Sequence, residues 1–483
     1  MSSSPSLPSP AVIIGAKKKA KTTSQKPTLG KKLAGLSYLF PSVERSTNQS
    51  ELENASVLDD KFVYLLAFIS IYLFLQIIPL FGFPRDYKYD NLLNPLNFAG
   101  FDIDNKGTLI GLGLLPLVIS GGLIQLLAGS SYLSFDFTKK NEVYAFSNLQ
   151  KLIAIIIALV VSSLNIFVFD KNFENVELLG KFLILAQWTV SQYFIIHIVE
   201  CIDQGYGFQS GIMTLALASY SAVLVENLLG VTSFNASNGK SEKTGVLFFL
   251  FNAITTPEYS WTEIFQRFFF RNDLPNFTTQ LISLIVGAAI VFWFNFRYEI
   301  IIKSTKMRNV QQAYPIRLFY NGIVAIWITF SFVTIIDYFV LNVAKLVPVE
   351  LPQIVSFALP LTYKIVQGLL LIKWNSEISM AWTKITGSVK TVMEQFKEQD
   401  IVVHSKRDSQ LELTKTVEQA TQTSAVLLGV VVALAGFFGF KFQNDILSGI
   451  VAFGSVMTLL EYVVVEMQEN GKDSLIFKSL GWA

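Results

Sequence analysis

The chain has few of the residues on which disulfide or metal chemistry depends. Its 483 residues include one cysteine, Cys201, and only two histidines, His197 and His404. A single cysteine excludes an intrachain disulfide. One cysteine and two histidines far apart in the sequence do not provide the ligand set of a zinc-type site. We therefore expect no metal and no cofactor.

Charged residues are scarce as well. Only 15% of the residues are charged and 52% are hydrophobic, whereas about 25% are charged in a typical soluble protein. Several apolar runs reach the roughly 20 residues that a helix needs to cross hydrocarbon. The composition indicates a polytopic membrane protein. No apolar stretch follows the first residues directly, so we expect no cleavable signal peptide.

The apolar runs predict an all-α fold with about ten transmembrane helices. They lie at 62–82, 107–130, 152–169, 178–201, 209–229, 278–297, 318–342, 356–381, 421–440 and 445–466. The segment 245–272 is also apolar, but TTPEYS interrupts it. We expect it to form helix on the membrane surface and not to cross, and a crossing there would reverse the orientation of every later span.

The distribution of lysine and arginine indicates the orientation. With cytosolic N- and C-termini, the loops on the cytosolic side, including 298–317 and 382–420, hold many basic residues. The opposite loops hold few for their length, as with Lys171 in the second of them. This distribution follows the positive-inside rule.

The two ends of the chain differ from the apolar middle. Residues 1–35 are rich in serine, proline and lysine, a composition that cannot bury a core and predicts disorder. Residues 36–61 are expected to form an amphipathic segment and a linker on the cytosolic surface. Residues 467–483 are expected to form a cytosolic tail.

Ionisable residues are rare inside the predicted spans. Transporters driven by protons or sodium usually bury acidic or basic groups near the middle of the membrane, but Asp337 and Glu461 lie near span ends here. A pathway lined by aliphatic side chains suits a channel that closes tightly around a substrate that it does not recognise specifically.

The segment 107–130 reads GTLIGLGLLPLVISGGLIQLLAGS. It resembles the second span of the SecY family, which forms the pore subunit of the Sec protein-conducting channel. Further blocks resemble the family in the same order: QIIPLFG at 76–82, QGYGFQSGI at 204–212, FRNDLPNFTT and FRYEIIIKSTKMRNVQQAYPIRLFY around the sixth span, and WTKITGSVKTVMEQFKEQDIVVHSKRD at 382–408. Within the family, the C-terminal LLEYVVVEMQENGKDSLIFKSLG and the region from GVLFFLF to FRNDLPN resemble the second, non-essential and co-translational pore protein of yeasts.

The resemblance implies an architecture. Two pseudo-symmetric halves of five helices, 62–230 and 278–466, are expected to form a clamshell around a central pore. A plug at 85–106 would seal the pore, and residues 231–277 would form a lumenal loop with the surface helix.

The resemblance also implies positions for the functional residues. The expected pore ring consists of Leu114, Val118, Gly122, Ile212, Ala216, Trp327 and Val451. The expected lateral gate contains Gln125, Ser120 and Thr334, and the expected plug contains Leu92, Leu93, Leu96 and Phe98. Contact with ribosomal RNA is expected at Lys303, Lys306, Arg308, Lys406 and Arg407. A narrow apolar ring excludes water and ions when closed, and basic loop residues bind phosphate.

These expectations combine into one function. The chain would be the pore subunit of a translocation channel in the endoplasmic reticulum membrane and not an enzyme. It would pass nascent chains and signal sequences from a bound ribosome, and release apolar segments into the lipid bilayer. Small beta and gamma subunits would be its partners. A secondary transporter for a small solute and a non-conducting ribosome anchor remain as alternatives.

Overall fold

The structure is a computed structural model, and it describes most of the apolar middle of the chain. The described residues are 57–82, 107–130, 132–133, 135, 140–169, 173, 176–208, 210–231, 233–235, 241–255, 259–271, 276–304, 311–319, 322–346, 353–386, 392–394, 396, 398, 401–403 and 409–470. The predicted N-terminal regions up to residue 56, the plug residues and most of the C-terminal tail lie outside them.

The predicted helical membrane fold is confirmed, because each of the ten expected spans corresponds to a helix. These helices are α2 (Val57–Ile77), α3 (Leu115–Gly129), α4 (Lys140–Leu164), α5 (Leu178–Cys201), α6 (Gly211–Leu229), α9 (Phe277–Phe294), α10 (Val324–Leu346), α11 (Gln353–Thr386), α13 (Ser409–Phe437) and α14 (Phe440–Asn470). In the described part of the chain, seven helices are long and apolar enough to cross a membrane.

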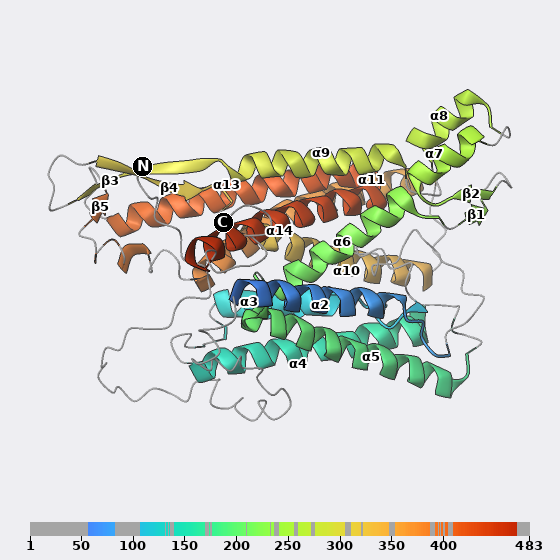
Figure 1. The fold of residues 1–483 in the computed structure, drawn as a ribbon, viewed down its shortest axis with the longest axis horizontal. Helices are drawn as coiled ribbons and strands as arrows, with labels where there is room; N and C mark the ends of the chain where they lie inside the picture. The colour runs from blue at the N-terminus through green and yellow to red at the C-terminus, as the bar shows by residue number, and fades with distance from the viewer. Residues whose placement is uncertain are drawn as a thin grey trace.

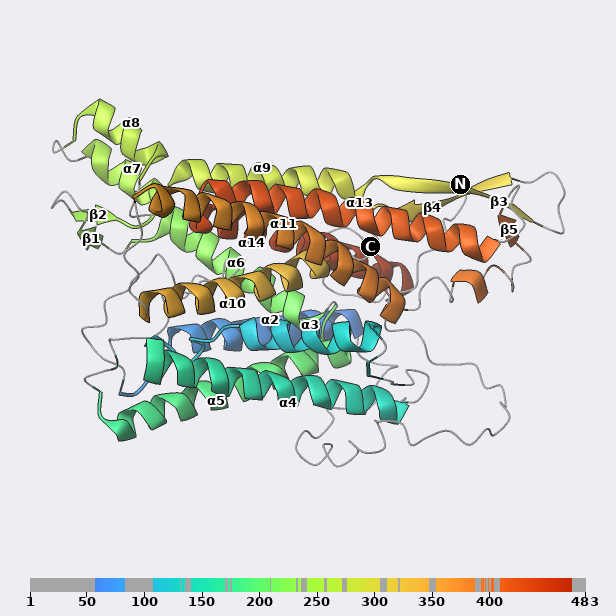
Figure 2. The ribbon, with the colours of Figure 1, turned by 180° about the vertical axis from the view of Figure 1, so that it is seen from behind.

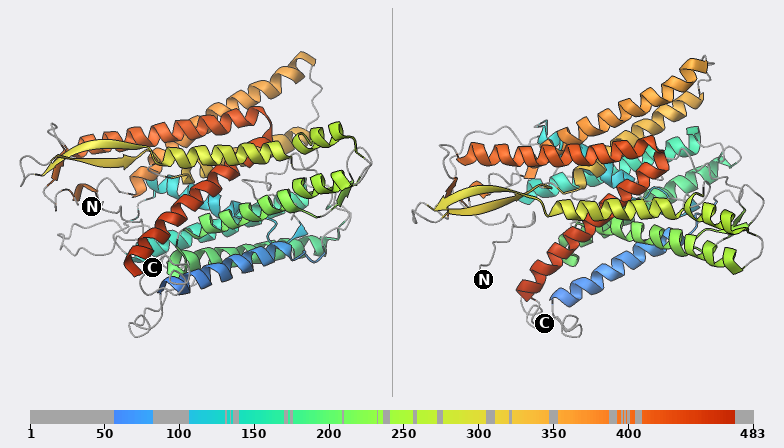
Figure 3. Two further views of the ribbon diagram at one scale, coloured as in Figure 1. Left: turned by 45° about the horizontal axis from the view of Figure 1, so that its top comes forward. Right: turned by 90° about the horizontal axis from the view of Figure 1, so that it is seen from above.

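The helices form two groups that run in roughly the same direction. Helices α2 to α5 lie together on one side, and α9, α11, α13 and α14 lie on the other, with α6 and α10 between them (Figures 1 and 2). Figure 3 shows α14 running obliquely away from the end of α13. The contact between α9 and α14 is very close, because a Cβ atom on Gly287 would lie 2.0 Å from the ring of Phe453. Small residues allow membrane helices to approach in this way.

Helix α3 begins later than the sequence predicts. Residues 107–114 form turns, and the helix starts only at Leu115. Gly113 has a φ of 55°, a conformation that favours glycine, and Pro116 lies in the first turn of the helix, where its missing N–H has no intrahelical partner to lose. The prediction of a continuous helix over 107–130 is therefore wrong in its first eight residues.

Hydrogen bonds to neighbouring segments fix this irregular stretch. Leu80 N donates to Gly107 O at 2.7 Å, and Leu109 N donates to Ile78 O at 3.1 Å. The indole of Trp188 on α5 donates to Thr108 O at 3.2 Å. A helix of 15 residues spans about 22 Å, less than the hydrocarbon thickness of about 30 Å, so the turns complete the crossing.

A buried ion pair that the sequence did not predict joins α4 and α5. Lys151 pairs with Glu200, and both side chains are less than 10% exposed. His197 Nδ1 lies 3.4 Å from the second oxygen of Glu200. Asp203 accepts a hydrogen bond from Gly211 N at 2.6 Å, which fixes the turn into α6. A buried pair of this kind is costly to break, because removing one partner leaves an uncompensated charge.

Small elements lie at the two ends of the bundle (Figure 1). One end carries β1 (Ser233–Asn235), β2 (Ser241–Lys243), α7 (Val246–Thr255) and α8 (Trp261–Phe269), and the other carries β3 (Arg297–Ser304), β4 (Gln311–Arg317) and β5 (Ile401–Val403). With 10 residues, α7 would extend only about 15 Å and is too short to cross the membrane.

Candidate functional site

The predicted pore-ring residues meet in the main apolar core. Leu114, Val118, Ala216, Trp327 and Val451 are all buried and belong to a single apolar cluster. Leu114 lies in the turn that precedes α3, and the others come from α3, α6, α10 and α14, so both groups of helices contribute. Ile212 is half-buried and packs against the same cluster. The structure thus places these side chains in one apolar core to which both halves contribute.

Gly122 and Trp327 depart from the medium-sized aliphatic residues of a uniform collar, and the structure shows how they combine. Trp327 is one of the largest fully buried side chains of the described residues. Gly122 of α3 faces Ile328, the residue that follows Trp327 on α10. A Cβ atom on Gly122 would lie 2.4 Å from Cγ2 of Ile328. The missing side chain on α3 thus lets α10 come close enough to place its bulky residues in the core.

Helix α3 packs against α10 and α11 through one face. Gly122, Gln125 and Gly129 are spaced by three and four residues and therefore share that face. A Cβ atom on Gly129 would lie 2.8 Å from the backbone oxygen of Ala381 in α11. The two glycines therefore allow close backbone contact at both ends of the face, and the amide of Gln125 lies between them.

The polar groups predicted for the lateral gate do not form a hydrogen-bonded cluster with one another. Ser120 Oγ donates to Leu117 O of its own helix at 3.0 Å. Gln125 Oε1 on α3 and Thr334 Oγ1 on α10 are buried without a hydrogen-bond partner among the described residues. An unsatisfied buried polar group costs about 1 to 3 kcal/mol. Each of these two atoms therefore lowers the stability of the packed helices.

A second polar cluster joins α10 to α11. Asp337 is buried and accepts hydrogen bonds from the Tyr363 hydroxyl and the Gln367 amide, one on each carboxylate oxygen. Asn375 of α11 donates to Ala425 O of α13 at 2.7 Å. These bonds connect α10, α11 and α13 as one unit, which faces α3 across a contact made mainly of small and apolar residues.

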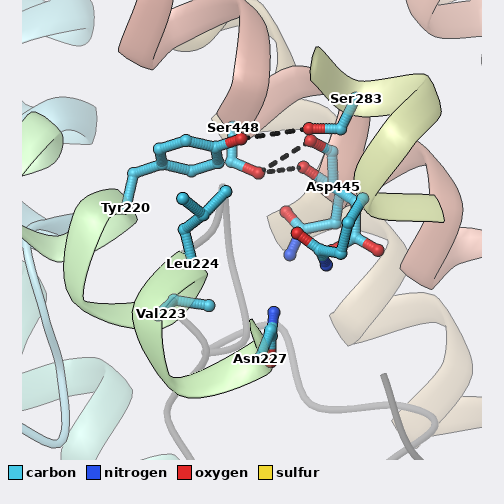
Figure 4. Close-up of a pocket in the computed structure, with 9 residues that line it drawn as sticks. Tyr220, Val223, Leu224, Asn227, Ser283, Asp445 and Ser448 are labelled. Carbon is cyan, nitrogen blue, oxygen red and sulfur yellow. Dashed lines mark hydrogen bonds between the residues drawn. The ribbon is translucent and has the colours of Figure 1, made fainter. Parts of the chain in front are cut away.

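The two halves also meet where α6 contacts α9 and α14, around a polar cavity of about 10 Å³ (Figure 4). Tyr220 of α6 and Ser283 of α9 share a hydrogen bond of 3.0 Å. The remaining polar residues that line the cavity are Asn227, Gln280, Asn444, Asp445 and Ser448. A polar space of this size is close to the volume of one water molecule. The halves are thus joined by the Tyr220–Ser283 hydrogen bond here and by apolar packing in the main core.

The two basic loops are joined in one three-stranded sheet with the order β4–β3–β5. In that sheet, Lys303 of β3 lies opposite Gln311 of β4 and Val402 of β5. A separate apolar core supports the sheet and consists of Ile300, Ile302, Ile316, Val392, Met393, Phe396, Leu413, Val417 and Ala420. The sequence alone predicts these segments to be separate charged loops, and this prediction is incomplete. The alternation of buried Ile300 and Ile302 with the half-exposed Ile301 is the signal in the sequence that indicates a strand.

An ion pair connects this sheet to the bundle. Arg317 Nη1 of β4 lies 2.6 and 2.7 Å from the two carboxylate oxygens of Glu461 on α14. Both side chains are more than a third exposed. The pair therefore helps to orient the sheet against α14 and adds little to the stability of the fold.

Several predicted site residues lie outside the described part of the chain. They are the plug residues Leu92, Leu93, Leu96 and Phe98 and the basic residues Lys306, Arg308, Lys406 and Arg407. Of the predicted ribosome-contact residues, Lys303 is the one that the structure places, and it lies on β3.

Comparison with known proteins identifies the class that this fold and core define. The SecY family model matches residues 108–468, which is most of the chain, and the chain belongs to the SecY family. The "Sec sixty-one protein homolog" of Saccharomyces cerevisiae is 27% identical over 465 residues, covering 88% of this chain and 93% of that protein. The "Protein transport protein SEC61 subunit alpha" of Neurospora crassa is 30% identical over 256 residues, 52% of each chain.

Solved structures share the fold. "The structure of a protein conducting channel" matches with a TM-score of 0.67 and 20% identity, covering 89% of this chain and 97% of the other. The "Cryo-EM structure of idle yeast Ssh1 complex bound to the yeast 80S ribosome" matches with a TM-score of 0.66 and 23% identity, covering 91% and 95%.

Proposed function

We propose that this chain is the pore-forming subunit of a protein translocation channel in the endoplasmic reticulum membrane. It conducts nascent polypeptides into the lumen and releases transmembrane segments sideways into lipid, mainly during translation. It is a channel component and not an enzyme. Both of its ends face the cytosol in this proposal. The observation that carries the proposal is the buried apolar collar, to which both halves contribute.

The collar accounts for non-specific conduction. The aliphatic side chains offer a passing chain no hydrogen bonds, and the indole of Trp327 offers a single donor. We therefore expect the passage not to select a sequence. In the closed state, apolar contact excludes water and ions. A segment at the open gate partitions into lipid according to its own transfer free energy, which disfavours a central charge by about 2.5 to 3.5 kcal/mol.

The ribosome and two small membrane subunits are the proposed partners. The sheet β4–β3–β5 with its own apolar core is the proposed ribosome-facing surface, because it carries Lys303 and joins both basic loops. Structural relatives are described as the Ssh1 complex bound to the yeast ribosome and as Sec61 in a canine ribosome-channel complex from the endoplasmic reticulum. In this proposal, the chain works in the same manner as the second yeast channel.

Photocrosslinking of a nascent chain tests this function. A photoreactive residue at Val118 is expected to crosslink to a polypeptide stalled on a ribosome during translocation. Ile156 of α4, which is 49% exposed on the outside of the bundle, is the matched control and should label lipid instead. Ribosomes that copurify without any crosslink at Val118 would contradict conduction and support a ribosome anchor.

A further inference from the structure

The helices α7 and α8 form a hairpin that leaves many large apolar side chains uncovered. The two helices pack on each other through a small core of Phe249, Ala253 and Ile264. Outside that core, the exposed apolar residues are Leu247, Phe248, Phe251, Ile254, Trp261, Phe265 and Phe270. Four of them are at least two-thirds exposed, which is unusual for aromatic side chains in contact with water.

The exposed Trp261 and Phe265 of α8 share one face with the half-buried Phe269. Trp261, Phe265 and Phe269 are spaced by four residues, and the rings of Phe265 and Phe269 are 4.7 Å apart. Glu263 and Gln266 lie on the other face and are exposed. A short amphipathic helix with aromatic residues on one face is typical of helices that lie in a membrane interface.

The hairpin is also placed at the membrane boundary by the helices that flank it. It follows α6 and leads directly into α9. Thr278 Oγ1 at the start of α9 donates to Phe269 O at 2.7 Å, and the rings of Phe268 and Phe277 are stacked at 4.8 Å. The outer face of α9 is apolar as well, with Leu281 and Ile285 exposed, so the uncovered surface continues from the bundle onto the hairpin.

A network of ion pairs holds the hairpin against β2. Its charged side chains point toward β2 and not toward the uncovered apolar face. Glu242 pairs with Arg267 and, at 3.9 Å, with Arg271. Arg271 also donates to the backbone oxygens of Lys243 at 2.9 Å and Thr244 at 3.1 Å. Burial, with a smaller contribution from Arg267, lowers the pKa of Arg271 to about 10, so the guanidinium stays charged at neutral pH.

We infer that the α7–α8 hairpin is an interfacial membrane anchor, whose apolar face lies in the leaflet at this end of the bundle. The occupant of the uncovered face is lipid, because the face continues the outer surface of α9, which a membrane-spanning chain exposes to lipid. Tryptophan and other aromatic residues favour the headgroup region. Because the hairpin is fixed to α9, this anchor sets the depth of the second half of the molecule. The inference depends on membrane insertion alone and not on protein conduction.

Site-specific fluorescence in lipid nanodiscs tests this anchor. Cys201 is the single native cysteine, so a Cys201→Ser background accepts one label at Phe265→Cys and, as the matched control, one at Gln266→Cys. We expect lipids that carry a shallow spin label to quench the label at position 265, and aqueous iodide to quench the label at position 266. The ratio of lipid to iodide quenching should be several-fold larger at position 265.

Two results would overturn the anchor. Equal exposure of both labels to iodide would place the hairpin in water, and shielding of position 265 from both quenchers would mean that protein covers the face. Phe251→Cys on α7 is a second test position, so that the measurement does not depend on the folding of one variant.

Discussion

Two neighbouring glycines on α3 have different surroundings, although the sequence does not distinguish them. A Cβ atom on Gly122 would lie 2.4 Å from Ile328, whereas nothing lies within 4 Å of one on Gly121. Ile328 is β-branched and cannot easily move its Cγ2 atom away. The sequence could show that Gly122 is smaller than the aliphatic residues expected in a collar, but the close contact that explains the glycine depends on how α10 packs.

We predict that Gly122→Ala loosens the gate. The added methyl group pushes α3 away from α10 and should cost the closed state about 1 to 3 kcal/mol. Translocation of a reporter with a weakened signal sequence should increase, as should ion conductance in planar bilayers. Gly121→Ala is the matched control and should match the unaltered protein. Equal effects of the two substitutions would contradict the assignment of this contact to the gate.

At the predicted gate, removing an unsatisfied polar group should lower translocation, whereas Gly122→Ala should increase it. Gln125→Leu removes a buried acceptor that has no partner and should stabilise the closed gate by about 1 to 3 kcal/mol. Weak signal sequences should then translocate less efficiently, by roughly tenfold for each 1.4 kcal/mol.

Thr334→Val removes the second unsatisfied group and completes a double-mutant cycle. Because Gln125 and Thr334 share no hydrogen bond, the two effects should add. An increase in translocation for Gln125→Leu would contradict the prediction for that variant, because it would show that the amide stabilises the closed state. The family resemblance located this pair, whereas its missing hydrogen bond could be learned only from the positions of the side chains.

At the scale of whole elements, periodicity identified the long helices and missed the strands. Long apolar runs leave few alternatives to a membrane helix, and α5 has the predicted bounds of 178–201. The start of α3 was wrong because Gly111, Gly113 and Pro116 are compatible with membrane helices, and only contacts with neighbouring segments determine that the chain turns there. Pairing of β3 with β5 joins residues about 100 positions apart, which local patterns do not reveal.

The joined sheet predicts that one loop positions the other. Phe396 is buried in the second loop, and its ring lies 5.1 Å from that of Tyr314 on β4. Phe396→Ala should cost about 3 to 5 kcal/mol of local stability and weaken ribosome binding in cosedimentation, although no charge is removed. Glu394→Ala, an exposed change in the same segment, should have little effect. If Phe396→Ala leaves ribosome affinity unchanged, the loops act independently.

At the scale of the whole molecule, two kinds of contact hold the halves together. The main core, which holds the predicted pore-ring residues, and the α3 face are apolar and closely packed, whereas the part of the α6 contact around Tyr220 and Ser283 is polar and surrounds a small cavity. Composition predicted a membrane bundle, and the family motifs predicted two halves. Neither could show that the contact at α6 is made of hydroxyl and amide groups drawn from three helices.

The polar contact predicts a modest effect on how easily the halves separate. Tyr220→Phe removes the hydrogen bond to Ser283 and should lower thermal stability by about 0.5 to 1.5 kcal/mol. Tyr64→Phe on the exposed side of α2 is the control and should be neutral. A neutral Tyr220→Phe would mean that the hydroxyl group contributes nothing to the contact between the halves.

A structure of the ribosome-bound chain with a stalled nascent polypeptide tests the central claim most directly. We predict that the polypeptide passes between Leu114, Val118, Ala216, Trp327 and Val451, with α3 separated from α10. A nascent chain that leaves the ribosome by another route, while these five side chains stay packed on one another, would contradict the account.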